Sequence, residues 1–113
     1  MFRVTKTFYW EAAHLLPLVP RDHKCGQLHG HSFRAEITLE SDILRADGFI
    51  RDLAELAPVA KFIRENWDDS LLTISTEEMA VKLFDKAREA CPETKRVRVY
   101  EGRTIWAEFE AHL

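Results

Sequence analysis

The stretch from Cys25 to Leu39 reads CGQLHGHSFRAEITL, and it joins a metal-binding pattern to the beginning of a β-strand. From Phe33 to Leu39, apolar side chains alternate with polar ones, which is the period of a strand with one buried face. His29 and His31 stand two positions apart just before this run. On a strand they leave the same face with Cα atoms about 6.6 Å apart, so both imidazoles can bind one ion.

The residues before this stretch predict a partner strand, and they include a third candidate metal ligand, His14. Apolar residues recur at even positions between residues 2 and 13, whereas residues 14–30 contain two prolines and two glycines and predict a long loop. Long loops in small domains are usually functional. His14 begins this loop, next to the first strand, and catalytic zinc takes three protein ligands and keeps an open position. The alternative interpretation is that these histidines are ordinary polar residues of a loop. It is disfavoured because four of the five histidines fall between His14 and His31.

Two helices are predicted in the second half of the chain. Asp52 can cap a helix that runs toward residue 67, and Pro58 within that segment predicts a kink or a restart. Ser75 and Glu78 have the spacing of a capping box, which predicts a second helix that ends near residue 90.

Two further strands are predicted over residues 96–100 and 105–111, with Gly102 in the turn between them. The order β-β-α-α-β-β indicates an α+β fold, in which an antiparallel four-stranded sheet carries two helices on one face. Such a sheet has two exposed edges, which proteins often pair with another chain. We therefore expect a homo-oligomer that forms through sheet edges.

Length and charge limit the class of protein. A chain of 113 residues is the usual size of one domain, so residues 1–113 are interpreted as a single domain. The net charge of −3 and the scattered lysines and arginines disfavour nucleic acid as a partner. The N-terminal residues lack an apolar signal core and no stretch is long enough to span a bilayer, so we expect a cytoplasmic protein without membrane contact. In that reducing compartment, Cys25 and Cys91 would stay thiols.

Two motifs carry a resemblance to a known family. Residues 8–14 (FYWEAAH) and 23–31 (HKCGQLHGH) resemble the family of 6-pyruvoyl-tetrahydropterin synthase and 6-carboxy-5,6,7,8-tetrahydropterin synthase. The spacing between the cysteine and His-Gly-His is that of the 6-carboxy branch, which serves queuosine and 7-deazapurine biosynthesis. The resemblance implies the tunnelling fold, in which sheets from several chains close into a barrel, trimers stack into hexamers, and active sites lie between chains.

The resemblance also implies roles for individual residues. Zinc would be held by His14, His29 and His31. Cys25, as a thiolate, would be the general base in a lyase reaction on 7,8-dihydroneopterin triphosphate, a small-molecule pterin substrate. Glu101 would anchor the pterin ring, and the segment of Thr76 would also bind substrate.

The chain departs from the family pattern in the catalytic segment. The family has Leu-Asp-His after the first helix; Asp68 matches the aspartate, but Asp69 replaces the catalytic histidine. Gly102 replaces the threonine that follows the anchoring glutamate. An ionised carboxylate cannot donate a proton near pH 7, so either catalysis is slowed or altered, or another residue such as His23 transfers the proton.

Several functions stay open from the sequence. The first is a zinc-dependent lyase that forms 6-carboxy-5,6,7,8-tetrahydropterin; pyruvoyl-type triphosphate elimination and altered pterin aldolase chemistry are its variants. The second is a pterin-binding protein with little turnover, which the replacements at Asp69 and Gly102 favour. A purely structural zinc is disfavoured, because structural sites are usually rich in cysteine.

Overall fold

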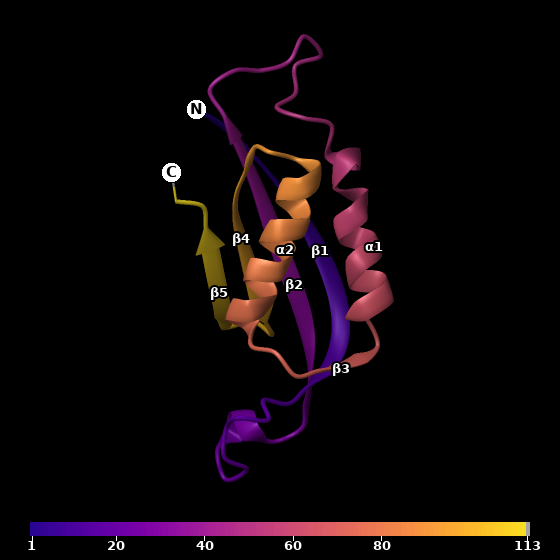
Figure 1. The fold of residues 1–113 in the computed structure, drawn as a ribbon, viewed down its shortest axis with the longest axis vertical. Helices are drawn as coiled ribbons and strands as arrows, with labels where there is room; N and C mark the ends of the chain where they lie inside the picture. The colour runs from indigo at the N-terminus through magenta and orange to yellow at the C-terminus, as the bar shows by residue number, and fades with distance from the viewer. Residues whose placement is uncertain (113) are drawn as a thin grey trace.

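The computed structural model describes residues 1–112, and for Cys25 it describes the backbone only. The helices and strands follow in the order β1 (Phe2–His14), β2 (His29–Ser41), α1 (Ala57–Asn66), β3 (Ser70–Leu72), α2 (Thr76–Ala90), β4 (Thr94–Glu101) and β5 (Ile105–Glu110). Short 3-10 helices occupy Lys24–Gly26 and Leu53–Leu56. Both α-helices lie against one face of a single sheet, as Figure 1 shows. The predicted α+β fold with two hairpins around two helices is confirmed.

The sheet has five strands in the order β3-β1-β2-β4-β5. The pairs β1–β2, β2–β4 and β4–β5 are antiparallel, whereas β3 runs parallel to the last three residues of β1. The prediction of an antiparallel four-stranded sheet was therefore wrong in strand number and in one direction. With only three residues, β3 is too short for hydrophobic alternation to reveal it.

The helix starts follow the predicted capping. The Asp52 carboxylate accepts a hydrogen bond from the Ala54 N–H, which starts the 3-10 turn, and α1 restarts at Ala57. Pro58 lies in the first turn of α1, where a missing N–H costs no hydrogen bond. Ser75 and Glu78 form the complete capping box of α2.

The core lies between the helices and the alternate residues of β1, β2 and β4. Trp10 stacks on Phe33 with ring centroids 5.5 Å apart, and Trp67 packs against Trp10 at 5.3 Å. Both tryptophans are buried core residues, with 2% and 4% of their surface exposed. Trp106 on the edge strand β5 is 54% exposed and is not part of this core. Cys91 is buried as a free thiol, and burial raises its pKa.

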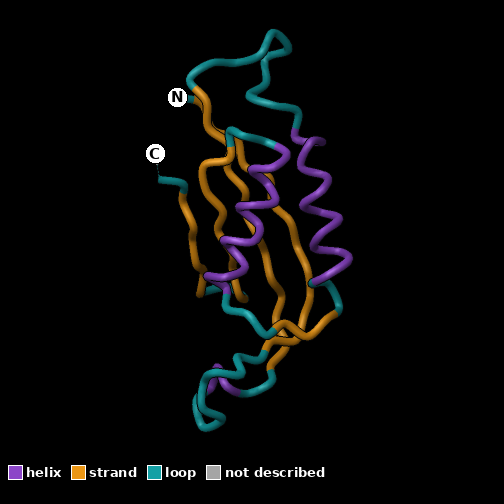
Figure 2. The backbone as a smooth tube through the Cα atoms, viewed as in Figure 1, coloured by secondary structure: helices purple, strands orange, loops and turns teal. Residues whose placement is uncertain are grey.

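The molecule is elongated, measuring 55 × 27 × 23 Å along its principal axes. Figure 2 shows that the loop of residues 15–28 and the loop of residues 42–52 lie at opposite ends of the long axis. No helix within residues 1–112 is both long and apolar enough to cross a membrane.

Candidate functional site

Three imidazoles meet where the first hairpin leaves the sheet. His14 is the last residue of β1 and pairs in register with His29, the first residue of β2. His31 follows two residues later and leaves β2 on the same face. Neighbouring ring centroids are 5.0 Å apart for His14 and His29, and 4.5 Å apart for His29 and His31. The strand register therefore brings the three predicted metal ligands together.

Glu101 faces these rings from β4. Val97 and Val99 are buried on the helix-covered face, and Glu101, two residues further on, shares that face at the end of the strand. Its Oε1 atom lies 3.5 Å from Nδ1 of His14, 3.1 Å from Nε2 of His29 and 2.9 Å from Nε2 of His31. A single carboxylate oxygen thus contacts all three imidazoles.

Backbone carbonyls fix the orientation of two of the rings. Nε2 of His14 donates to the Ile74 carbonyl, and Nδ1 of His29 donates to the Gln27 carbonyl, both at 2.6 Å. A carbonyl oxygen only accepts, so the opposite nitrogen of each neutral ring carries a lone pair. In both rings that nitrogen faces Glu101. Metal-binding histidines are typically held by such a hydrogen bond on their other nitrogen.

These donors fit a divalent cation. Nδ1 of His14 is buried and has no hydrogen-bond partner among the described residues. Lone pairs that face a carboxylate oxygen repel it unless a cation or a proton lies between them. The ligand atoms of His14, His29 and Glu101 all lie within 4.8 Å of one another. His31 is outside this mutually close group, but its Nε2 atom lies 2.9 Å from Glu101 Oε1. Imidazole and carboxylate ligands suit zinc among the common biological metals.

His31 borders a cavity of about 520 Å³ next to this cluster. The cavity is lined by Glu11, Ala12, Ala13, Gly30, His31, Ser32, Asp69 and Ser70. Burial lowers the pKa of His31, the Glu101 carboxylate opposes that shift, and His29 adds to it. The Glu11 carboxylate accepts a hydrogen bond from the Ser32 hydroxyl at 2.9 Å. This cavity gives a small molecule access to His31, and its two acidic lining residues are Glu11 and Asp69.

The two aspartates between α1 and β3 are placed differently. Asp69 lines the cavity of His31, and its φ of 55° puts its backbone in the left-handed region. Asp68 lines a separate pocket beside Tyr9 and Arg64, and its carboxylate accepts a hydrogen bond from the Glu11 N–H at 3.1 Å. The structure therefore places Asp69, and not Asp68, at the cavity that His31 borders.

Cys25 and Thr76 are not joined to the cluster by a described contact. Cys25 lies in the 3-10 turn of the long loop, and its side chain is outside the described part of the structure, so its role as base stays a prediction. Thr76 is buried in the first turn of α2, where its hydroxyl donates to Glu77. Its substrate-binding role also stays a prediction.

Gly26 packs closely against the backbone of the long loop. A Cβ atom at this position would lie 2.1 Å from the Pro20 carbonyl oxygen and 2.7 Å from that of Val19. By contrast, a Cβ atom on Gly30 would meet nothing within 4 Å. Only the glycine next to Cys25 is thus required by close packing.

The sequence did not predict that Glu101 lies against the three imidazole rings. The sequence does contain one signal: Glu101 continues the alternation of Val97 and Val99, which predicts that it lies on the core face of its strand. The pairing of Glu101 with Phe33, which brings it to the histidines, depends on the register of β4 against β2 and is not visible in local sequence.

Comparisons with known proteins show the family to which this chain belongs. The sequence model of the family described as 6-pyruvoyl tetrahydropterin synthase matches residues 3–112. The 6-carboxy-5,6,7,8-tetrahydropterin synthase of Synechocystis is 35% identical over 122 residues, covering 96% of this chain and 93% of its own. The Bacillus subtilis enzyme of the same name is 31% identical over 112 residues, covering 99% and 68%.

The fold comparison shows the architecture that this chain shares with solved structures. The structure of Caenorhabditis elegans 6-pyruvoyl tetrahydropterin synthase superposes with a TM-score of 0.82 at 18% identity, covering 98% of this chain and 96% of that one. At this identity the likeness shows the fold alone: a mixed sheet curled into a half-barrel with two helices, the tunnelling fold. Together with the match over residues 3–112, these findings show that the chain belongs to the 6-pyruvoyl tetrahydropterin synthase family of pterin synthases.

Proposed function

We propose that this chain is a zinc-dependent lyase that converts 7,8-dihydroneopterin triphosphate to 6-carboxy-5,6,7,8-tetrahydropterin, a step of queuosine and 7-deazapurine biosynthesis in the cytoplasm. The observation that carries the proposal is the convergence of His14, His29 and His31 beside a cavity large enough for a small molecule. The Synechocystis relative, which bears the name of this activity, supports the choice of product.

The proposed metal ligands are His14, His29 and His31. Bound zinc would supply a Lewis acid that stabilises negative charge developing on substrate oxygens. The Ile74 and Gln27 carbonyls already hold two of the rings with a lone pair toward the site. Little reorganisation is then needed when the ion binds.

Cys25 and Asp69 are the proposed proton-transfer residues. A thiolate is the reactive form of Cys25, and the neighbouring Lys24 in the same 3-10 turn is a cation that favours it. Asp69 borders the cavity of His31, where an ionised carboxylate can accept a proton but has none to donate at pH 7. We expect proton return to the substrate to be the slow part of catalysis.

Glu101 and Thr76 are the proposed substrate-binding residues. A carboxylate can accept two parallel hydrogen bonds, from the amino group and the ring N–H of a pterin, and this pairing also sets the orientation of the ring. Pairing of sheet edges between chains would give trimers and stacked hexamers. Asp68, which lies outside the cavity of its own chain, would then serve a site shared with a neighbouring copy.

The direct test is to incubate zinc-loaded protein with 7,8-dihydroneopterin triphosphate and to identify the pterin product by mass. We expect 6-carboxytetrahydropterin from the wild type and none from Cys25→Ala. Asp69→His should increase the rate, because an imidazole can both accept and donate a proton near neutral pH. A wild type that binds the substrate and returns it unchanged would instead be a pterin-binding protein.

A second candidate is a pterin aldolase. Pyrococcus furiosus dihydroneopterin monophosphate aldolase is 26% identical over 109 residues, covering 89% of this chain and 90% of its own. The replacement of the expected histidine by Asp69 also favours altered chemistry. Incubation with dihydroneopterin monophosphate decides between the two, because cleavage of the side chain as an aldehyde would identify the aldolase and an unchanged substrate would exclude it.

A further inference from the structure

We infer that Glu101 is a fourth metal ligand in the substrate-free protein, and that it must leave the metal when it binds the ring of a substrate. Oε1 of Glu101 is 2.9–3.5 Å from a nitrogen of each of the three histidines. Two ligands on one tetrahedral zinc with bonds of 2.0–2.1 Å are about 3.3 Å apart. The oxygen therefore already stands at the distance of a neighbouring ligand from each ring.

The electrostatics of Glu101 also call for a cation. The carboxylate is only 16% exposed, and no lysine or arginine within residues 1–112 forms an ion pair with it. Its polar neighbours are imidazoles, and His14 and His29 have their donor N–H groups bonded to backbone carbonyls instead. A carboxylate that is mostly removed from water is costly unless it is paired or coordinates a metal.

The backbone of Glu101 is fixed, so only its side chain can move. Glu101 pairs with Phe33 across β4 and β2, and the next residue, Gly102, donates its N–H to the Ser32 carbonyl at 2.9 Å. Gly102 has a φ of 66°, which turns the chain directly after this strand. A change of rotamer is therefore the available way for the carboxylate to exchange one partner for another.

This arrangement joins two functions in one side chain. A zinc site with four protein ligands is closed to exchangeable molecules, whereas a site with three keeps an open position. A ring that takes the Glu101 carboxylate as its partner would free the fourth position at the same moment. The second half of this inference rests on the proposed function, whereas the closure of the site does not.

The test uses cobalt(II) in place of zinc and azide as an exogenous ligand, with the visible absorption of the cobalt as the readout. Wild type, Glu101→Ala and Glu101→Gln are titrated with azide. We expect azide to bind Glu101→Ala at least about tenfold more tightly than wild type, a difference of about 1.4 kcal/mol. Glu11→Gln is the matched control, because it removes a negative charge near the cavity of His31 without touching the proposed ligand set.

Each outcome decides the inference. Equal azide affinity in wild type and both Glu101 variants would overturn it, and so would an equal gain in Glu11→Gln, which would show a simple charge effect. Should Glu101→Ala fail to fold, Glu101→Gln keeps the shape of the side chain and decides in the same way. Addition of neopterin, whose binding is followed by its own fluorescence, should raise azide affinity in the wild type. Neopterin that does not bind would contradict the proposed function and leave the azide result unaffected.

Discussion

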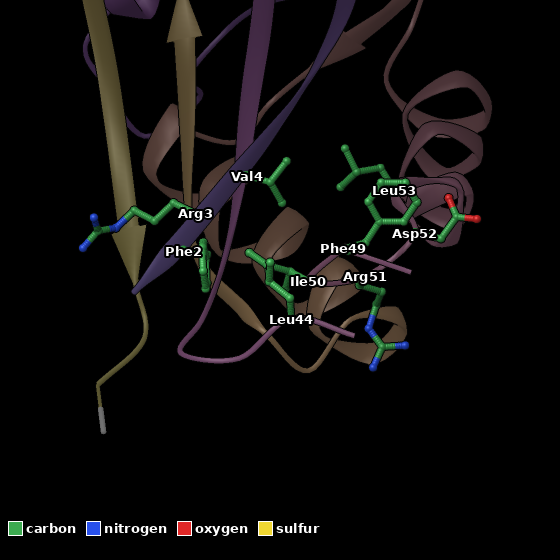
Figure 3. A pocket seen from close by; sticks show the side chains of 10 residues that line it. Phe2, Arg3, Val4, Leu44, Phe49, Ile50, Arg51, Asp52 and Leu53 are labelled. Carbon is green, nitrogen blue, oxygen red and sulfur yellow. The ribbon is translucent and has the colours of Figure 1, made fainter. Parts of the chain in front are cut away.

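The two ends of this elongated molecule contain two different kinds of pocket. At the end of residues 42–52, Figure 3 shows apolar side chains, among them Phe2, Leu44 and Phe49, around a cavity of about 430 Å³. The arginines there are paired, since Arg51 donates to both oxygens of Glu93 at 2.7 and 3.1 Å and Arg3 donates to Glu40. At the other end the histidine cluster contains a buried nitrogen without a hydrogen-bond partner among the described residues.

The two ends differ in how their polar groups are paired. The cavity near Arg51 is the more apolar, yet its charged groups are satisfied within the chain. At the histidine end, the imidazole nitrogens point at the Glu101 carboxylate, an arrangement that a cation or a proton between them would stabilise. Buried atoms without a hydrogen-bond partner among the described residues also include Nε1 of Trp10 and Nε of Arg34 and Arg96. The convergence of three imidazoles on one carboxylate, and not a single unpaired atom, therefore distinguishes the candidate site.

The largest expected effect is on metal binding at the histidine end. His29→Ala combined with His31→Ala should abolish the binding of zinc, because only two of the four candidate ligands remain. Phe49→Ala at the opposite end is the control and should bind zinc like the wild type. Metal analysis after dialysis measures both. Zinc retained by the double variant at the wild-type level would show that the ion binds elsewhere.

A smaller effect on zinc binding is expected from Gly26, and none from Gly30 on the other side of His29 in the chain. Gly26→Ala should weaken zinc binding by about 10–100-fold, the range for loss of a supporting contact, because the displaced loop contains the Gln27 carbonyl that orients His29. Gly30→Ala has free space around its new methyl group and should leave the affinity unchanged. Competition with a chromophoric chelator measures both. Equal losses in the two variants would mean that the loop shape does not matter.

The smallest expected effect concerns the opposite end. Hydrogen bonding to Arg51 lowers the pKa of Glu93, so this carboxylate stabilises the fold above the ordinary glutamate pKa and loses that effect as the pH falls through its lowered value. Glu93→Gln should reduce the free energy of unfolding by about 1 kcal/mol at pH 7. The difference should disappear in strong acid. Urea titrations at several pH values measure the free energy of unfolding of both proteins. A difference between wild type and Glu93→Gln that stayed constant with pH would contradict this role of the carboxylate.

The parts of the fold that depend on local sequence were predicted well. Alternation from Phe33 to Leu39 marked β2, Asp52 marked the 3-10 turn that precedes α1, and Ser75 marked the start of α2. The strand β3 was missed, because three residues have no period and its pairing partner lies in β1, more than fifty residues earlier in the chain.

The candidate site shows the same limit. His29 and His31 share a face because two positions along a strand always do, so local sequence was enough to pair them. His14 required only a hairpin between adjacent strands. To predict that Glu101 lies beside the histidines, the register between β2 and β4 would have to be known. Both helices lie between these strands in the chain, and no local sequence pattern indicates their register.

The left-handed backbone of Asp69 restricts which residue types can replace one another there as sequences diverge. A φ of 55° is strained for branched or bulky side chains but is adopted readily by glycine, asparagine, aspartate and histidine. Exchange between aspartate and histidine at this turn therefore leaves the scaffold intact. A descendant of this chain could gain or lose an imidazole beside His31, and with it a proton donor, without any compensating substitution elsewhere.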